Sequence, residues 1–253
     1  MINTVIVRIP AKTIINGISS KNEKPDYKKA LIQHENYIQA LKKCNVSLIS
    51  ILNPLEKYPD SCFVEDTAVL TDECAIITNI GTESRKGEEK FIIKELENFY
   101  TNIFKINSPG TLDGGDVLQI EQDFYIGISE RTNKEGAIQL KNILENFNYN
   151  VNFVNIKNLL HLKTGISYLG NNYILASTTF KNYTQFEKYN IIFVDDDEIY
   201  SANSININDF IIMPDGYPKT LKKIKARGFK VLKVSTSEFK KIDGGLSCLS
   251  LRI

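Results

Sequence analysis

A repeat of roughly 45 residues constrains the fold of this chain more than any other feature of its sequence. Four stretches that begin near residues 67, 115, 165 and 207 each pair two β-rich apolar runs across a polar turn, as β-hairpins do. A polar residue marks the start of the first strand in each unit, and the markers follow one another after 48, 48, 42 and 45 residues. Near-equal intervals indicate five copies of one supersecondary unit. The markers are Glu65 with Asp66, Asp113, His161, Asn203 and Cys248.

Each hairpin is followed by a polar link, a helical pattern and another short apolar run. Asp26 and Asn133 stand at N-cap positions before apolar stripes of helical period. Pro218 stands in the first turn of a further helix, which Gly228 ends. The repeating unit is therefore two strands, a helix and a third strand (ββαβ). If five such units close into a ring, they form a propeller, and the marker residues meet at its centre.

The composition favours a small molecule as the partner of this chain. Basic and acidic residues number 31 and 30, and the net charge of +1 argues against a nucleic-acid surface or steering to a membrane. We expect no membrane span, because no stretch reaches about 18 consecutive apolar residues, and we see no secretory leader. Four scattered cysteines without a CxxC pair favour a reducing compartment, so we expect a cytoplasmic protein. We treat residues 1–253 as a single domain.

Three of the markers are residue types of nucleophilic catalysis. Cys248 follows two glycines and a serine instead of an apolar run, which favours a chemical role over packing. His161 can act as general acid and base, and Asp113 can orient its imidazole and favour the protonated form. The structural alternatives are a core histidine and a glycine turn with capping aspartates. The remaining cysteines are interpreted as packing residues: Cys44, Cys62 and Cys74.

Additional charged residues indicate the kind of substrate. Asp60, Glu65 and Asp66 form an acidic cluster, and several carboxylates suit a planar guanidinium cation. Arg85 and Arg131 occupy equivalent repeat positions, from strand end to helix start, so we expect both on one rim, where they would hold a substrate carboxylate. An arginine derivative carries both groups. The expected reaction is attack of Cys248 on the guanidinium carbon, protonation of the leaving amine and hydrolysis of a thiouronium intermediate, with no metal or organic cofactor.

The motifs that contain these residues resemble a known family. FVEDTAVL, GTLDGGDVL, YIGISERTN, LLHLKTGISYL and KIDGGLSCLSLR, together with the opening IVRIPAKTIINGIS, are similar to those of the dimethylarginine dimethylaminohydrolases, especially the short bacterial type. This family belongs to the pentein (amidinotransferase-like) superfamily. The resemblance implies a five-bladed α/β propeller with pseudo-fivefold symmetry. It also implies hydrolysis of Nω-methylated arginines to citrulline and a methylamine, and makes a homodimer plausible.

The resemblance assigns roles residue by residue. It implies Cys248 as nucleophile, His161 as proton donor and Asp113 as the partner of His161, a position where relatives have glutamate or aspartate. It further implies three groups of substrate contacts. Glu65 and Asp66 would bind the guanidinium, Asp60, Arg85 and Arg131 would bind the amino-acid end, and the backbone near Ile242 and Asp243 would line the site. Ile18 falls in a lid where the family tends to have leucine.

Three alternatives remain open from the sequence. The first is an arginine or agmatine deiminase on the same scaffold, although the chain has no room for the helical insertion of arginine deiminases, and agmatine lacks a carboxylate for the two arginines. The second is a non-catalytic propeller related to a ribosome-associated translation factor, which would not need the cysteine, histidine and acid. The third is a zinc site made by Cys248, His161 and Asp113, whose separations lack the paired spacing of a structural site.

Overall fold

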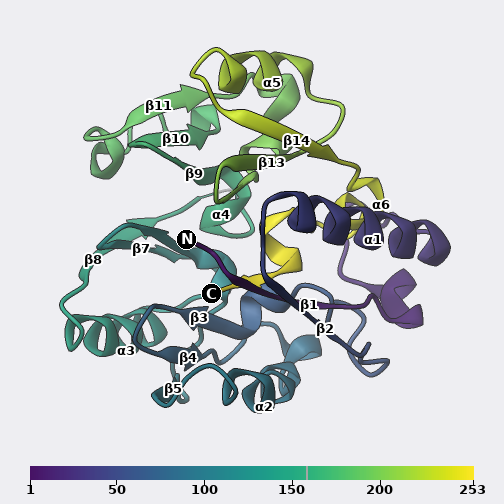
Figure 1. Cartoon of the computed structure of the whole chain (residues 1–253). Coiled ribbons are helices and arrows are strands. Elements are labelled where there is room, and N and C mark those ends of the chain that lie inside the picture. Colours follow the sequence, from purple (N-terminus) through teal and green to yellow (C-terminus); the bar gives the residue numbers. More distant parts are fainter. Residues whose placement is uncertain (158) are drawn as a thin grey trace. The chain divides into compact units, whose positions relative to one another are not determined.

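The computed structural model describes residues 1–157 and 159–253, and its strands form three-stranded sheets of one recurring design (Figure 1). The chain divides into two compact units, residues 1–63 with 165–252, and residues 64–164 with residue 253. In each sheet the middle strand pairs antiparallel with one neighbour and parallel with the other. A hairpin followed by a parallel third strand is the arrangement that the repeat predicted.

The unit of residues 64–164 contains two of these sheets. In the first, the short hairpin of β3 (Ala68–Leu70) and β4 (Ala75–Ile77) is extended by β5 (Ile103–Lys105). In the second, β6 (Val117–Ile120) and β7 (Asp123–Ile128) are extended by β8 (Asn150–Asn155). A sheet of this design buries the middle strand, and Phe124 and Ile126 of β7 are almost fully enclosed.

The other unit contains three sheets of the same design. Two of them are continuous in sequence, and the third combines the two ends of the chain, because the C-terminal strand pairs antiparallel with the first strand. The strands of these sheets are β9 (Ile166–Gly170), β10 (Tyr173–Ala176) and β11 (Asn190–Phe193); β12 (Ile205–Ile207), β13 (Phe210–Pro214) and β14 (Lys230–Val234); and β15 (Leu251–Arg252), β1 (Thr4–Arg8) and β2 (Leu48–Leu52).

The longer helices begin where the capping residues predicted. The Asp26 side chain accepts a hydrogen bond from Lys29 N at 2.9 Å, at the start of α1 (Tyr27–Lys43). The Asn133 side chain accepts one from Gly136 N at 2.8 Å, at the start of α3 (Lys134–Glu145). Each cap satisfies one of the backbone N–H groups that a first helical turn leaves without a partner. Pro218 is the first residue of α5 (Pro218–Lys225).

One expected helix is wrong. Between β10 and β11 the chain forms 3₁₀ turns at Thr178–Phe180 and Thr184–Phe186 where the repeat predicted an α-helix. Residues 177–189 contain three threonines, one serine and one asparagine, whose side chains compete with helical hydrogen bonding. Phe180 and Phe186 are instead buried against each other, with ring centroids 5.8 Å apart.

The remaining helices have one turn each: α2 (Ile93–Leu96), α4 (Leu162–Gly165) and α6 (Ser237–Lys240).

Each long helix covers a hydrophobic cluster of its own unit. Tyr37 and Leu41 of α1 pack with residues of β1 and with the C-terminal Leu246 and Leu249. Leu140 and Leu144 of α3 pack on the β6–β7 hairpin. None of the helices in residues 1–157 and 159–253 combines the length and the apolar character that crossing a membrane requires.

Candidate active site

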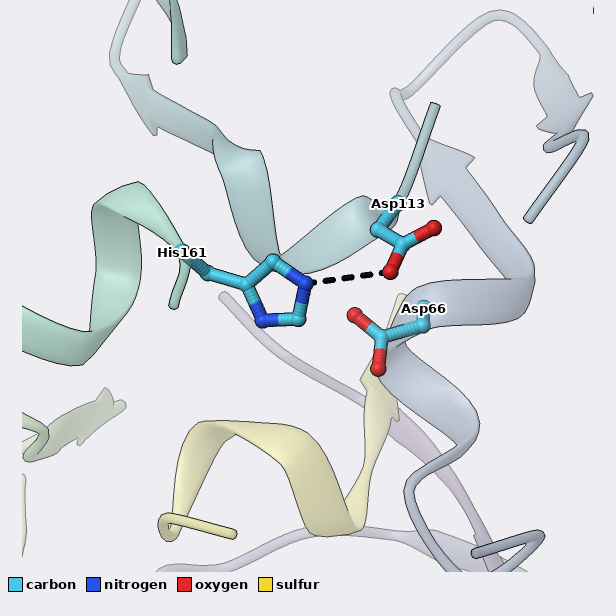
Figure 2. Close-up of side chains that lie close together, drawn as sticks. All are labelled: Asp66, Asp113 and His161. Atoms are coloured by element: carbon cyan, nitrogen blue, oxygen red, sulfur yellow. Dashed lines mark hydrogen bonds and ion pairs between the residues drawn. The ribbon is translucent and has the colours of Figure 1, made fainter. Parts of the chain in front are cut away.

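A histidine and two aspartates meet in the interior of the unit of residues 64–164 (Figure 2). His161 Nε2 lies 3.0 Å from Asp113 Oδ2, and one polar atom each of His161, Asp113 and Asp66 lies within 4.8 Å of the others. All three side chains are buried. Each residue lies within or directly before the turn that leads into the first strand of a hairpin, so the common position that the repeat predicted brings these three markers together.

Local backbone geometry explains how the three side chains reach one another. Gly115 N donates to Asp66 Oδ1 at 2.9 Å, and Gly81 N donates to Asp113 Oδ1 at 2.8 Å, so both carboxylates are held by main-chain donors. A Cβ atom on Gly115 would lie 2.7 Å from His161 Nδ1. The imidazole therefore occupies space that only a glycine at this position leaves open.

The electrostatics of this cluster favour a protonated imidazole. Burial by itself lowers the pKa of His161, but the charge of Asp66, the hydrogen bond to Asp113 and the charge of Asp116 together raise it from 6.5 to about 9. Burial likewise works against the charged form of Asp66, yet His161 and Arg85 hold its pKa below the ordinary value. At neutral pH the cluster therefore presents an imidazolium that can donate a proton.

Asp116 belongs to the same cluster and was not predicted as a site residue. Its Oδ1 accepts from Leu162 N at 2.9 Å and its Oδ2 from the Ser129 hydroxyl at 2.6 Å, and the side chain is fully buried. Burial raises the pKa of Asp116, and the charge of His161 opposes this effect. The second aspartate of the motif LDGGDVL was the signal in the sequence.

The two acids expected to bind a guanidinium already have cationic partners. Glu65, which is 2% exposed, accepts from Lys163 Nζ at 2.7 Å, and Asp66 Oδ2 lies 2.6 Å from Arg85 Nη1. Lys163 was not predicted as a site residue. Its position two residues after His161 was the available signal, because the turn that places the imidazole also places its neighbours.

The structure corrects the expected location of Arg85. Its side chain is not on an exposed rim: the residue is 5% exposed, and the guanidinium donates to Asp66 and, through Nε and Nη2, to Glu88 at 2.9 and 2.7 Å. The TESRKGE stretch has many charges, which suggested solvent, but Arg85 and Glu88 stand three residues apart across a 3₁₀ turn and pair with each other. A role of Arg85 in holding a substrate carboxylate stays a prediction.

Arg131 differs from Arg85 in being partly exposed. It lies between β7 and α3, where Arg131 N donates to the Ser129 hydroxyl at 2.9 Å. Its backbone packs against Gly81, where an added Cβ would lie 2.2 Å from Arg131 O. Since Gly81 N is a donor to Asp113, the main chain of Arg131 supports the hydrogen bond that fixes this carboxylate.

In the other unit, the expected lid and amino-acid contacts form a second group. Ile18 N donates to Asp60 Oδ1 at 3.0 Å, and Ser20 donates to both oxygens of Asp243 at 2.7 and 2.8 Å. A Cβ atom on Gly17 would lie 3.1 Å from Ile242 Cδ1. The segment around Ile18 is therefore placed against Asp60, Ile242 and Asp243, which the sequence analysis assigned to one substrate site.

Cys248 differs from the other cysteines of the chain. None of the four, all of which lie among the described residues, forms a disulfide, but Cys44, Cys62 and Cys74 are buried, as predicted, whereas Cys248 is partly exposed. Its Sγ accepts from Gly245 N at 3.4 Å. The expected strand from Cys248 onward is wrong, because Cys248 lies in the 3₁₀ turn Ser247–Leu249 and β15 begins only at Leu251.

The predicted site residues thus fall into one group in each unit. The meeting of Cys248 with His161 at a common centre stays a prediction. Among the described residues, the atoms of Asp66, Asp113 and His161 have the mutual spacing of metal ligands, but Arg85 already neutralises Asp66. The group in residues 64–164 is Glu65, Asp66, Arg85, Asp113, Arg131 and His161, and the group in the other unit is Ile18, Asp60, Ile242, Asp243 and Cys248.

Comparison with known proteins identifies relatives over the whole chain. The N(G),N(G)-dimethylarginine dimethylaminohydrolase of Pseudomonas aeruginosa is 46% identical over 254 residues, and each protein covers the other completely. The Streptomyces coelicolor enzyme of the same name is 30% identical and covers 98% of this chain, which covers 96% of it. A solved structure of the Pseudomonas enzyme, a Cys-to-Ser variant complexed with citrulline, superposes with a TM-score of 0.98 at 45% identity and full mutual coverage.

These relatives also establish the fold class. The match to the Pseudomonas structure confirms the predicted five-bladed α/β propeller of the pentein superfamily, with one three-stranded sheet for each blade. The N-terminal domain of the cyanobacterial arginine dihydrolase ArgZ has the same fold, with a TM-score of 0.90 at 19% identity over 98% of this chain and 97% of that domain. A family model described as "N,N dimethylarginine dimethylhydrolase, eukaryotic" matches residues 11–249. The chain therefore belongs to the dimethylarginine dimethylaminohydrolase family.

Proposed function

We propose that this chain hydrolyses Nω-methylated arginines, namely asymmetric dimethylarginine and monomethylarginine, to citrulline plus dimethylamine or methylamine. Family membership supports this function, and the observation that carries it is the buried His161–Asp113 pair, whose Nε2–Oδ2 distance is 3.0 Å and whose histidine has a pKa raised to about 9. An amine leaves a guanidinium carbon readily only as the neutral molecule, so an acid must be ready to protonate it at neutral pH.

The proposed reaction begins at Cys248. Its thiolate forms a bond to the central guanidinium carbon, and His161 donates a proton to the substituted nitrogen, whose bond to carbon then breaks. The product of this step is an S-alkylthiouronium intermediate, in which the former guanidinium carbon of the substrate is bonded to Cys248 Sγ. The now neutral His161 takes a proton from water, whose oxygen forms a bond to the same carbon. The carbon–sulfur bond then breaks, the thiolate leaves, and the new hydroxyl group loses its proton to solvent, which gives citrulline. Side chains supply each proton transfer, so the proposal includes no metal or organic cofactor.

The proposed substrate contacts follow the two groups of residues. Glu65 and Asp66 bind the guanidinium, in competition with the internal cations Lys163 and Arg85 that they contact now. Arg131, which is partly exposed, binds the substrate carboxylate. The remaining assignments are Asp60, Arg85, Ile242 and Asp243 at the amino-acid end and Ile18 in the lid.

Solved structures of relatives support a small substrate of this type. One is the Pseudomonas Cys-to-Ser variant complexed with citrulline, and another is a dimethylarginine dimethylaminohydrolase His-to-Gly variant as an adduct with S-methyl-L-thiocitrulline, with a TM-score of 0.98 at 45% identity. Citrulline is the product that the proposed reaction releases.

A second candidate is hydrolysis of arginine itself with release of ammonia, the first step that an arginine deiminase would share with an arginine dihydrolase, because a Synechocystis protein named "Bifunctional arginine dihydrolase/ornithine cyclodeaminase ArgZ" is 24% identical over 91% of this chain. The two activities differ only in the leaving group, which is ammonia for arginine and an alkylamine for methylarginines. The chain spans about a third of that relative's length. The methylarginine reading is preferred because the relatives at 46% and 30% identity match over nearly their whole length.

The test is a comparison of four substrates with the purified chain in the presence of a chelator. Citrulline, alkylamine and ammonia are measured separately after incubation with asymmetric dimethylarginine, monomethylarginine, arginine and agmatine. The proposal expects citrulline and alkylamine in equal amounts from the methylarginines, with the largest kcat/KM among the four. Ammonia from arginine as the best reaction would assign the chain to the deiminases, and no turnover of any guanidine would refute an enzymatic role.

The proposed function includes a domain organisation, a cellular compartment and an oligomeric state. Residues 1–253 act as a single catalytic domain, in agreement with the full mutual coverage of the Pseudomonas relative. The four cysteines, which are scattered and form no disulfide among the described residues, support a reducing compartment, and hence the cytoplasm. A homodimer rests on the family resemblance, and light scattering coupled to size-exclusion chromatography would give about twice the chain mass of 28.7 kDa if it forms.

A further inference from the structure

The turn that carries Cys248 is held by a side chain from a distant part of the same unit. Asn203 follows a 3₁₀ segment, Asp196–Ala202, and precedes β12. Its Oδ1 accepts from Ser247 N at 2.9 Å, and its Nδ2 donates to Ser247 Oγ at 2.9 Å. The amide thus contacts both the backbone N–H and the hydroxyl of the residue directly before Cys248. Asn203 is 4% exposed and Ser247 is 3% exposed, so water competes little for these bonds.

The glycine at position 245 is explained by the same amide. A Cβ atom there would lie 2.5 Å from Asn203 Cγ and Oδ1, which is closer than any real contact. Neither Gly244 nor Gly245 has a positive φ, so backbone conformation does not demand these glycines. At Gly244 an added Cβ would lie 2.2 Å from Phe63 Cζ. The two glycines of the DGGLSC motif therefore leave room for two side chains that pack against the turn, those of Phe63 and Asn203.

A second contact comes from the same segment. The Tyr200 hydroxyl donates to Gly244 O at 2.8 Å and lies 3.1 Å from Thr236 Oγ1. Burial raises the pKa of Tyr200, and the nearby Cys248 adds to this effect, so the phenol stays neutral and keeps its donor. The two ends of the 244–247 turn are therefore fixed by Tyr200 and Asn203, which are only three residues apart in the sequence.

We propose that Asn203 is a positioning residue for the nucleophile: its amide fixes Ser247, and thereby the place of Cys248 Sγ and of the Gly245 N–H that donates to it. This inference rests on the proposed role of Cys248. A thiol that attacks a trigonal carbon must approach it along a narrow direction, and a displacement of about 1 Å can cost about 100-fold in rate. The Gly245 N–H also stabilises the thiolate, so a loosened turn makes the thiol harder to ionise.

The alternative is that Asn203 only stabilises the fold, and a matched control separates the two. Asn208 also binds backbone through its side chain, because its Oδ1 accepts from Ile2 N and its Nδ2 donates to Ile2 O and Cys44 O. It has a φ of 53°, which suits glycine. Asn208→Gly therefore removes a comparable set of hydrogen bonds in the same unit without touching the 244–248 turn.

The experiment compares Asn203→Ala, Asn203→Asp, Ser247→Ala and Asn208→Gly. For each variant, kcat and KM for asymmetric dimethylarginine are measured, together with the pH dependence of Cys248 alkylation by iodoacetamide, located by peptide mass spectrometry. We expect Asn203→Ala to lower kcat by about 10- to 100-fold with KM changed less than threefold. Its alkylation midpoint moves to higher pH. Asn203→Asp keeps an acceptor for Ser247 N and can accept from the Ser247 hydroxyl, so kcat at its own pH optimum returns to within a few fold of wild type.

Two results would show that Asn203 does not position the nucleophile. If Asn203→Ala loses as much stability as Asn208→Gly but keeps the wild-type kcat and alkylation midpoint, Asn203 is only structural. Should Asn203→Ala fail to fold, Ser247→Ala carries the test, because it removes one of the two bonds: a several-fold loss of kcat supports the proposal and an unchanged kcat overturns it. Alkylation does not require turnover. A wild type that hydrolyses no methylarginine therefore refutes the proposed function, while the alkylation midpoints still judge the role of Asn203.

Discussion

His161 Nε2 and Asp113 Oδ2 lie 3.0 Å apart in the interior of one unit, although 48 residues separate them in the chain. Burial by itself lowers the pKa of His161, but the charge of Asp66, the hydrogen bond to Asp113 and the charge of Asp116 together raise it to about 9. A histidine held in its protonated form at neutral pH has consequences for both stability and catalysis, and each can be measured.

Stability should fall as pH rises through the His161 titration. The pKa of this histidine is about 9 in the folded chain, above the 6.5 of a solvent-exposed histidine in the unfolded chain, so the folded state binds the proton more tightly. Its contribution is fully present below pH 6.5 and is lost as pH rises to about 9. The loss should amount to about 3 kcal/mol. Urea unfolding of wild type and His161→Ala between pH 6 and 10 measures it, and equal pH dependence in the two proteins would contradict the raised pKa.

Asp116→Asn should lower the pKa of His161. The carboxylate of Asp116 is one of the charges that raise this pKa, and an asparagine can still accept from Leu162 N through its Oδ1. Activity that needs the imidazolium should therefore be lost at a lower pH than in wild type. The alkaline limb of the kcat profile and the His161 Hε1 chemical shift in NMR spectra report the same change. The exposed Asp209 gives the control, and a shift as large in Asp209→Asn would argue against a local effect.

Arg85 and Arg131 should respond differently to replacement by methionine. Arg85→Met leaves Asp66 and Glu88 as buried carboxylates without their guanidinium, which should cost about 3–5 kcal/mol of unfolding free energy. Arg131→Met should change stability by less than about 0.5 kcal/mol, because the side chain is partly exposed, and should raise KM if Arg131 binds the substrate carboxylate. Chemical denaturation and steady-state kinetics separate the two effects. A larger stability loss for Arg131→Met than for Arg85→Met would contradict the structure.

His34 should make the chain sensitive to mild acid. Burial in α1 lowers its pKa from 6.5 to about 4, and its Nε2 has no hydrogen-bond partner among the described residues. The unfolded chain therefore binds a proton first, and stability is lost as pH falls from 6.5 towards 4. Between pH 7 and pH 5 the loss should be about 2 kcal/mol. His34→Leu should remove this part of the pH dependence, and a parallel decline in both proteins would assign it to other groups.

The repeat allowed much of the fold to be predicted, because its period comes from strands and turns that are local in sequence. Strand pairs β3–β4, β6–β7, β9–β10 and β12–β13 lie where the hairpin patterns indicated. The missing helix after β10 was not foreseeable from the period, since three threonines and two buried phenylalanines favour the 3₁₀ turns of that segment. Within the acidic run near residue 196, the repeat gave no indication that Glu198 is buried and accepts from Lys219 N and Thr220 N at the start of α5.

For the candidate site, residue type and repeat position predicted the His161, Asp113 and Asp66 cluster. What the sequence did not reveal is which cation neutralises which acid. Arg85 was expected at a rim, and Lys163 was not considered, because ion pairs depend on side-chain directions that a strand or turn pattern does not specify. Asn203 was recognised only as a repeat marker. Its contact with Ser247 spans 44 residues of sequence and depends on side-chain directions that the repeat does not specify.

The most direct test of the central claim is to trap the intermediate. In His161→Gly, the thiolate of Cys248 can still attack S-methyl-L-thiocitrulline and expel methanethiol, but no imidazole remains to activate water against the thiouronium product. Mass spectrometry of the trypsin-digested protein should find the adduct on the peptide Ile242–Arg252, which contains Cys248 as its single cysteine. The account predicts near-complete modification of this peptide and none of the peptides with Cys44, Cys62 or Cys74. No adduct, or an adduct on another cysteine, would contradict it.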